Sequence, residues 1–333
     1  MAHNTQLTAA EIGTLWYQCM SDSMAMQMLT FFLQRSDDQE IRPVIEYAKG
    51  LSQKHLLKIS EILGSESVPI PTGFTAEDID LAAPRLYSDP FYLSYVRNMA
   101  RIGLQRYGLA LTSSARADVR KFLHECIGTS AELDEKATQA ELSKGLYVRS
   151  PYIPIPERKE TVQSGNFMGS LFGKQRPLLA MEIDHLFINA QSNAMGKALL
   201  IGFSQVAKAP DIRDYLLRGK QISHKHIEVL SSTLINEDIP APMSQDSYVT
   251  GSTVSPFSDK LMTYHTAMLQ GAGLGNYGVS MSMSMRMDIV TMYSRLMVEI
   301  GQYVEDGTHL TIQKGWMEKP PQSADRKELA LSR

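Results

Sequence analysis

The chain has 333 residues, enough for about two domains of ordinary size. Its 33 Lys and Arg residues nearly balance 36 Asp and Glu residues, and a formal net charge of −3 excludes the strongly basic surface of a typical nucleic-acid binder. With only two cysteines, Cys19 and Cys126, a disulfide framework and a multi-cysteine metal site are also excluded.

The first residues show no basic stretch followed by an apolar run, so we expect no secretory signal peptide. Residues 186–207 and 261–285 are poor in charge, but they carry too many polar side chains for a membrane-spanning helix. We therefore expect a cytoplasmic protein without a membrane span and without a nucleic-acid partner.

The first predicted helix begins after Thr8 and runs to about Gln34, because Thr8 and Glu11 have the spacing of a capping box. A second helix, capped by Asp37 or Asp38, runs to about Leu63. Its apolar residues recur every three or four positions and share one face.

Prolines and glycines interrupt residues 64–87, which predicts a long crossover. A third helix is predicted to start at Ser88, and a fourth over 116–144 ends at Gly145. No alternating run is long enough for a sheet strand. Short, long and short connections are typical of an up-down four-helix bundle with one long crossover, the ferritin-like topology.

The chain also repeats itself. With an offset of 171 residues, residues 11–63 match 182–234 without a gap, and from residue 88 onward the offset is 170. The shared residues include Glu11/Glu182, Met24/Met195, Phe32/Phe203, Lys54-His55/Lys225-His226, Tyr107/Tyr277 and Arg116/Arg286. A solenoid repeat is only ~20–50 residues long.

The period therefore predicts an all-α protein of two tandem ferritin-like four-helix bundles, related by internal duplication. The predicted domains are residues 1–150 and 178–333, and residues 151–177 form an extended connector rich in Pro and Gly.

The apolar helices suggest how the two copies meet. Residues 24–33 contain no charge, and a helix that is apolar all round must be covered on both sides. We expect each copy to be the partner of the other, with 186–207 and 261–285 at the interface. Glycines would allow close helix contact there: Gly271, Gly273, Gly275 and Gly278.

Ferritin-like di-iron sites use a Glu from two helices and Glu-x-x-His from the other two. Here Ser52 and Ser223 stand where that motif needs Glu, three residues before His55 and His226. The third helix of each copy carries no carboxylate between its first turn and its end. We expect no cofactor, with Fe, Mn or Zn as the alternative, and we predict no catalytic residue or nucleophile.

The two histidines still need partners if they face the bundle interior. One interpretation is a buried, hydrogen-bonded polar layer, and the other is the wall of a small-molecule or metal pocket. The candidate residues of this layer are Ser52, His55, Tyr107, Ser223, His226 and Tyr277.

Several segments carry a family resemblance, namely 68–96, the Ser-x-Lys-His of the second helix, 144–157 and 306–321. They resemble a tandem ferritin-like family of spore-forming, Bacillus-type bacteria that is similar to spore coat protein F. The resemblance implies paired four-helix bundles and a link to the spore coat or sporulation. It implies no activity, substrate or catalytic residue.

Two functions stay open at this point. The first is a non-enzymatic structural or interaction protein, spore-associated, that self-associates through apolar helix faces as a homo-oligomer or binds spore-coat proteins. The second is a ligand- or metal-binding bundle in which His55 and His226 face inward.

Overall fold

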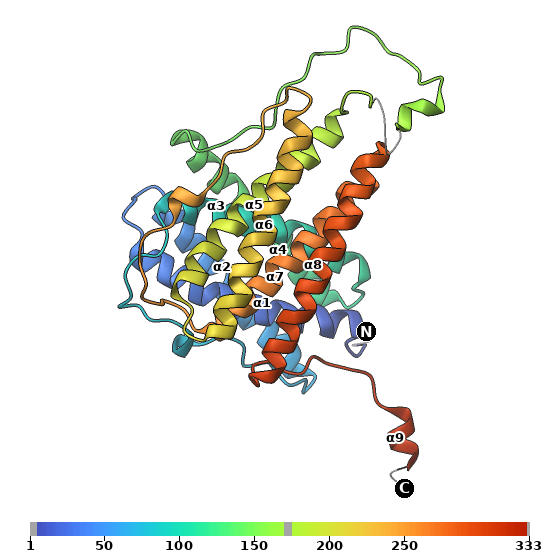
Figure 1. The fold of residues 1–333 in the computed structure, drawn as a ribbon. Helices are drawn as coiled ribbons and strands as arrows, with labels where there is room; N and C mark the ends of the chain where they lie inside the picture. The colour runs from blue at the N-terminus through green and yellow to red at the C-terminus, as the bar shows by residue number, and fades with distance from the viewer. Residues whose placement is uncertain (1–4, 170–174, 332–333) are drawn as a thin grey trace.

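The computed structural model describes residues 5–169 and 175–331. It is all-helical over these residues, with two sets of four long helices and a short C-terminal helix, α9 (Arg326–Leu331), that stands apart in Figure 1. The first set is α1 (Ala9–Arg35), α2 (Arg42–Ser65), α3 (Asp89–Ser113) and α4 (Ala117–Ser143). The second set is α5 (Ala180–Val206), α6 (Pro210–Ile235), α7 (Asp259–Ser282) and α8 (Met287–Gln313). Single 3-10 turns lie at Ala76–Asp78, Gly165–Met168 and Asp246–Tyr248.

Most of the predicted helix ends are found within a residue or two. The Thr8 hydroxyl accepts from the Glu11 amide at 3.3 Å, and the Glu11 carboxylate accepts from the Thr8 amide at 2.8 Å, which completes the capping box. Asp38 accepts from the amides of Glu40 and Ile41, but these residues form a turn and α2 begins later, at Arg42. At the end of α4, Gly145 has a φ of 66°, a conformation that glycine adopts without strain.

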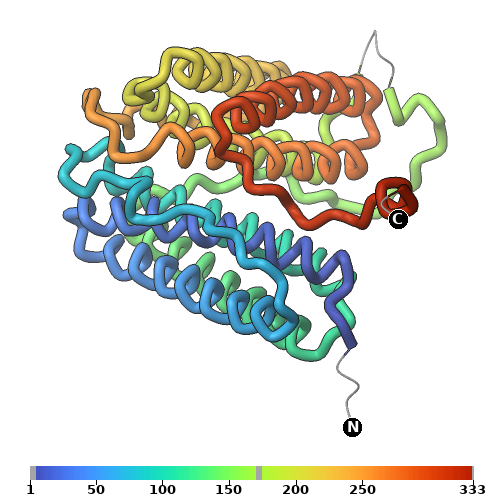
Figure 2. Tube along the Cα trace, turned by 90° about the horizontal axis from the view of Figure 1, so that it is seen from below, coloured from blue at the N-terminus to red at the C-terminus, as the bar shows by residue number. Residues whose placement is uncertain are grey.

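The two sets of helices form two layers, which Figure 2 shows one above the other. Residues from all eight long helices join in a single apolar core shared by the layers, and each layer has a smaller core of its own. The charge-free stretch of α1 is buried in the shared core, as are Leu199 and Phe203 of α5. The other copy therefore covers these helices, as the sequence predicts.

The two crossovers, residues 66–88 and 236–258, pair with each other across the molecule. The Ser88 amide donates to the Tyr248 carbonyl at 2.9 Å, and the Ser258 amide donates to the Asp78 carbonyl at 2.8 Å. The offset of 170 residues maps each of these bonds onto the other. Two isolated β-bridges, Ile79 with Phe257 and Tyr87 with Val249, are related in the same way. The repeats thus meet about a pseudo-two-fold axis.

The expected role of the glycines in α7 is wrong in most positions. A Cβ on Gly273 or Gly278 would face α8 of the same repeat, and one on Gly275 would meet open space. Only Gly271 faces the first repeat, near Arg106. Close approach between the repeats is instead provided by Gly202 in α5, where a Cβ would overlap the Tyr87 ring.

Within the described residues, no helix combines the length and the hydropathy needed to cross a bilayer.

Candidate functional site

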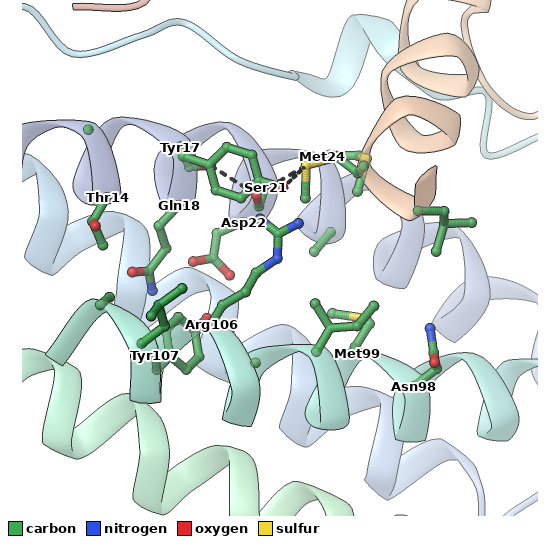
Figure 3. A pocket seen from close by; sticks show the side chains of 18 of the residues that line it. Thr14, Tyr17, Gln18, Ser21, Asp22, Met24, Asn98, Met99, Arg106 and Tyr107 are labelled. Atoms are coloured by element: carbon green, nitrogen blue, oxygen red, sulfur yellow. Dashed lines mark hydrogen bonds between the residues drawn. The ribbon is translucent and has the colours of Figure 1, made fainter. Parts of the chain in front are cut away.

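A cavity of about 450 Å³ opens between α1 and α3 of the first repeat, and α7 of the second repeat covers one of its walls. Most of its lining is apolar, and Met99 and Met268 are part of it. Tyr17, Gln18, Asp22 and Arg106 project into the same space in Figure 3. A concave apolar site with a few convergent polar groups is typical of small-molecule binding.

Small residues of α1 and α3 leave part of this cavity open. Gly13, Thr14 and Ala110 line it, and their equivalents in the second repeat are Asp184, His185 and Ser280. There the Ser280 hydroxyl lies 3.2 Å from His185 Nδ1, which bridges α5 and α7. The matching cavity of the second repeat is only about 60 Å³.

Two further hydrogen bonds join α5 to α7 in the second repeat, where they fill the space that corresponds to the cavity. Asn189 donates to the Ser280 hydroxyl at 2.7 Å, and Asn193 donates to the Tyr277 hydroxyl at 2.7 Å. The equivalents of these asparagines are Gln18 and Asp22. Gln18 contacts Cys126 on α4 and Tyr107 on α3, whereas Asp22 pairs with His55 on α2. The first repeat therefore lacks the counterpart of the Asn189–Ser280 bond, because Ala110 replaces Ser280, and its α1–α3 bond runs from Gln18 to Tyr107 instead.

Asp22 lines the cavity and forms a buried ion pair with His55 of α2, which lies behind the wall. His55 Nδ1 lies 3.2 Å from an Asp22 carboxylate oxygen, and the two side chains are about one-tenth exposed. Burial by itself disfavours a charged imidazole, but the hydrogen bond and the charge of Asp22 outweigh it and raise the pKa of His55 to about 10. The pair is therefore ionised and carries no net charge at neutral pH.

Arg106 supplies a second positive charge at the wall. Its guanidinium lies over the Tyr17 ring, 4.4 Å from the ring centroid, in a cation–π contact. No carboxylate of the described residues lies within 4.0 Å of it. The Tyr17 hydroxyl is already used, because it donates to the sulfur of Met268.

Two further polar atoms at the cavity have unmet hydrogen-bonding capacity. Gln18 and His265 are 4% and 2% exposed, and neither Gln18 Oε1 nor His265 Nδ1 has a partner among the described residues. His265 Nε2 lies 2.6 Å from the hydroxyl of Tyr95, its own equivalent across the pseudo-two-fold axis. Burial lowers the pKa of His265 to about 4, so this imidazole is neutral at pH 7.

The six residues of the predicted polar layer fall into two different arrangements. In the second repeat Tyr277 donates to His226 Nδ1 at 3.0 Å, and His226 Nε2 donates to Glu299 at 3.2 Å. Burial lowers the pKa of His226 and outweighs the effect of Glu299. Ser223 is buried on the same helix.

In the first repeat the polar partner of His55 is Asp22, and Tyr107 contacts the imidazole only edge to ring, with centroids 5.9 Å apart. Ser52 is buried beside it on α2. The sequence reasoning missed Asp22 and Arg106. A signal was present, because the repeat alignment places Asp22 opposite Asn193 and Arg106 opposite Asn276, a change of charge at matched positions.

Over residues 5–169 and 175–331, no group of three or more His, Cys, Asp and Glu side chains has the arrangement of a metal site. The expectation that the protein carries no Fe, Mn or Zn stays a prediction, which elemental analysis of the purified protein checks.

Over the described residues, fold and cavity together define an all-helical protein of two repeated domains, with a pocket in the first repeat that α7 of the second covers on one side. The chain belongs to the family described as "Protein of unknown function (DUF3231)", which matches residues 1–158 and again 166–329.

Among solved structures, the chain is similar to that of a candidate spore coat protein from Bacillus halodurans, with 18% identity. The match covers 47% of this chain and 98% of that one, with a TM-score of 0.39. No curated protein matches the sequence.

Proposed function

We propose that this protein binds a small, largely apolar molecule in the cavity between α1, α3 and α7. The observation that carries the proposal is an apolar space of about 450 Å³ with polar side chains at its wall, among them Gln18 and His265, whose buried Oε1 and Nδ1 atoms have no partner in the described part of the chain. Buried polar groups in proteins are nearly always hydrogen-bonded, so each such atom calls for a partner. A ligand in the cavity, or water held with it, would supply these bonds once the side chains of Gln18 and His265 rotate toward it.

The difference between the repeats supports the same conclusion. Duplication supplied two equivalent spaces, and bulkier and bridging side chains fill one of them. An open cavity costs stability, since its lining loses packing contacts. Its retention in one repeat alone is consistent with use of that space.

The side chains around the cavity are better suited to binding than to nucleophilic chemistry. Burial raises the pKa of Cys19 to about 11, so its thiol is protonated at neutral pH. Cys126 is completely buried. His55 is ionised and paired with Asp22, so it has no free lone pair with which to act as a base.

The proposal is tested with a substitution that places a large side chain at the opening of the cavity. Gly13 lines the cavity and a Cβ there meets nothing within 4 Å, so the backbone tolerates a side chain and Gly13→Trp brings an indole to the opening. We expect the fluorescence of a neutral apolar probe, N-phenyl-1-naphthylamine, to rise on binding the native protein. Its affinity should fall roughly tenfold or more in Gly13→Trp, because the indole takes up the volume the probe needs.

Gly128→Trp is the matched control, because Gly128 lies on α4 away from the cavity and its Cβ position is equally open. Equal probe binding by native protein and both variants would refute the proposal, since the probe would then sit elsewhere.

We also propose that each repeat is a ferritin-like four-helix bundle. The support is the order of connections: α1 and α2 form one hairpin, α3 and α4 form another, and a long crossover joins them. That order matches the bundle topology with one long connection.

A structural role at the spore, implied by the family resemblance, is a second candidate. The connector favours an interaction role, because the side chains of Tyr152 and Ile155 are 88% and 90% exposed. If the connector holds a partner or a second copy, Tyr152→Ser with Ile155→Ser should abolish association in sedimentation velocity and leave probe binding unchanged. Unchanged association would remove this candidate.

A further inference from the structure

We infer that the ligand of this cavity is an anionic amphiphile, a single carboxylate on an apolar chain or ring, and that Arg106 binds the carboxylate. This inference rests on the proposed binding function and names the chemical class of the ligand.

The charges around the cavity point to an anion. Asp22 and Arg106 are its charged lining residues, and the Asp22 charge is balanced by His55 at 3.2 Å. The guanidinium of Arg106 is left as the charge without an ion-pair partner among the described residues, and its contacts there are the Tyr17 ring and a hydrogen bond to the Tyr17 side chain. A positive charge beside an apolar wall is costly until an anion pairs with it.

Guanidinium chemistry makes carboxylate the matching group. The planar fork of Arg106 can donate two parallel hydrogen bonds to one carboxylate, an arrangement that an alcohol or an amine does not permit. A cationic ligand would instead meet Arg106 at the wall and would have to compete with His55 for Asp22. The geometry therefore favours an anion over a neutral or a cationic head group.

The two repeats again provide an internal comparison. Asn276 replaces Arg106 and Asn193 replaces Asp22 in the second repeat, where the cavity shrinks to about 60 Å³. The charge and the open volume are thus lost together. This is expected if the guanidinium serves the contents of the cavity, and it is not required if Arg106 only supports the fold.

The size and the lining of the cavity limit the size and the chemistry of the apolar part of the ligand. A volume of about 450 Å³ has room for on the order of 15 non-hydrogen atoms, which admits one short chain or a small ring system and excludes a two-chain lipid. Met24, Met99 and Met268 line it, and flexible thioethers adapt to apolar groups of different shape. A free monocarboxylate therefore fits better than a phospholipid.

The test compares three ligands of equal chain length, decanoate, 1-decanol and decylamine, in displacing N-phenyl-1-naphthylamine from the full chain at pH 7.5. We expect decanoate to bind most tightly to the native protein. Arg106→Gln should weaken decanoate roughly 10- to 100-fold, the loss expected for hydrogen bonds between charged groups. Binding of 1-decanol should stay unchanged, which shows that the cavity itself is intact.

Two controls separate a specific contact from general effects. Arg295→Gln removes the same charge from an exposed position on α8 and should leave all three affinities unchanged. Arg106→Lys keeps the charge but loses the planar fork, and it should bind decanoate with intermediate affinity.

Failure of this inference can be told apart from failure of the proposed function. If all three ligands bind equally and Gly13→Trp blocks them all, the cavity binds ligands but the anionic head group is wrong. If decanoate weakens equally in Arg295→Gln, the preference is only a response to net charge, and the inference is also wrong. If none of the three displaces the probe while Gly13→Trp still blocks the probe, the amphiphile class is refuted. If the probe itself does not bind, the binding function is refuted.

Discussion

At the scale of single residues, matched histidines have different charges in the two repeats. His55 faces a carboxylate on α1; against the effect of burial, Asp22 and to a smaller extent Cys126 raise its pKa to about 10. His226 faces a tyrosine hydroxyl that an amide holds in place, and its pKa is lowered by burial. The two repeats also differ at one position of their first helices, which is Asp22 in the first repeat and Asn193 in the second. It shows how an isosteric change can convert a polar layer into a charged one.

Asp22→Asn tests the role of this carboxylate. We expect the variant to lose roughly 1–3 kcal/mol of unfolding free energy at pH 6.5, because the charged hydrogen bond is lost while a neutral His55 is tolerated as His226 is. The folded pKa of His55 lies above its ordinary value of 6.5, so the folded protein holds this proton more tightly. The contribution is therefore complete below about pH 6.5 and is lost as the pH rises through 10.

Urea denaturation of both proteins at pH 6.5 and pH 10 measures this effect, and the difference between them should shrink at the higher pH. A difference that is constant or that grows with pH would show that His55 is not charged in the folded protein.

At the scale of the elements, the two crossovers pack against helices of the opposite repeat with different side chains. Tyr87 donates through its hydroxyl to the Leu199 carbonyl at 2.7 Å, and Gly202 leaves room for its ring. At the equivalent contact Phe257 lacks the hydroxyl and packs edge-on against Phe31, with centroids 5.2 Å apart. One half of the interface thus pairs Tyr87 with Gly202, and the other half pairs Phe257 with Phe31.

Gly202→Ala should destabilise the protein by roughly 1–3 kcal/mol, because a methyl group there overlaps the buried Tyr87 ring. Gly196→Ala is the matched control on the same helix, since a Cβ at Gly196 meets nothing within 4 Å. That change should be neutral or should raise stability by a fraction of a kcal/mol, because alanine favours helix. Thermal denaturation of the three proteins compares them, and equal effects of the two substitutions would contradict this account of the interface.

At the scale of the whole molecule, the repeats share one core. Phe32 of α1, Phe203 of α5 and Leu261 of α7 belong to the same buried cluster, and the paired crossovers add hydrogen bonds to it. The 3-10 turn of residues 76–78 and its equivalent at 246–248 lie next to this pairing. The interface therefore resembles the interior of a domain more than a contact between independent domains.

A protease site inserted at residue 160, in the exposed connector, tests this organisation. We expect the cleaved halves to elute together with the mass of the intact chain, because separation would expose the apolar faces of α1 and α5. Size-exclusion chromatography with light scattering gives the masses. Two soluble monomeric halves would show that the shared core is not required.

Much of the fold could be predicted because its signals are local or periodic. The Thr8 capping box, the proline-rich crossovers and Gly145 set helix ends through interactions within a few residues. Internal duplication then doubled the information, since each boundary was seen twice. The start of α2 was placed a few residues early, because Asp38 caps a turn there and not the helix itself.

The candidate site could be predicted only in part. His55 and His226 are recognisable from their position on the inner face, but their partners come from other helices and depend on how those helices are spaced. The repeat alignment contained the differences Asp22/Asn193 and Arg106/Asn276, yet it gave no sign that they mark one cavity. That requires the distance between α1 and α3.

By itself, the sequence determined an all-helical chain, its division into two copies and the need for the apolar helices to be covered, because periodicity, capping and self-similarity are written along the chain. Only the tertiary structure decided that the crossovers pair about a pseudo-two-fold axis and that one copy keeps an open cavity with Arg106 at its wall. Those features depend on small differences in side-chain volume and bridging between helices far apart in sequence, and such differences have no local signature.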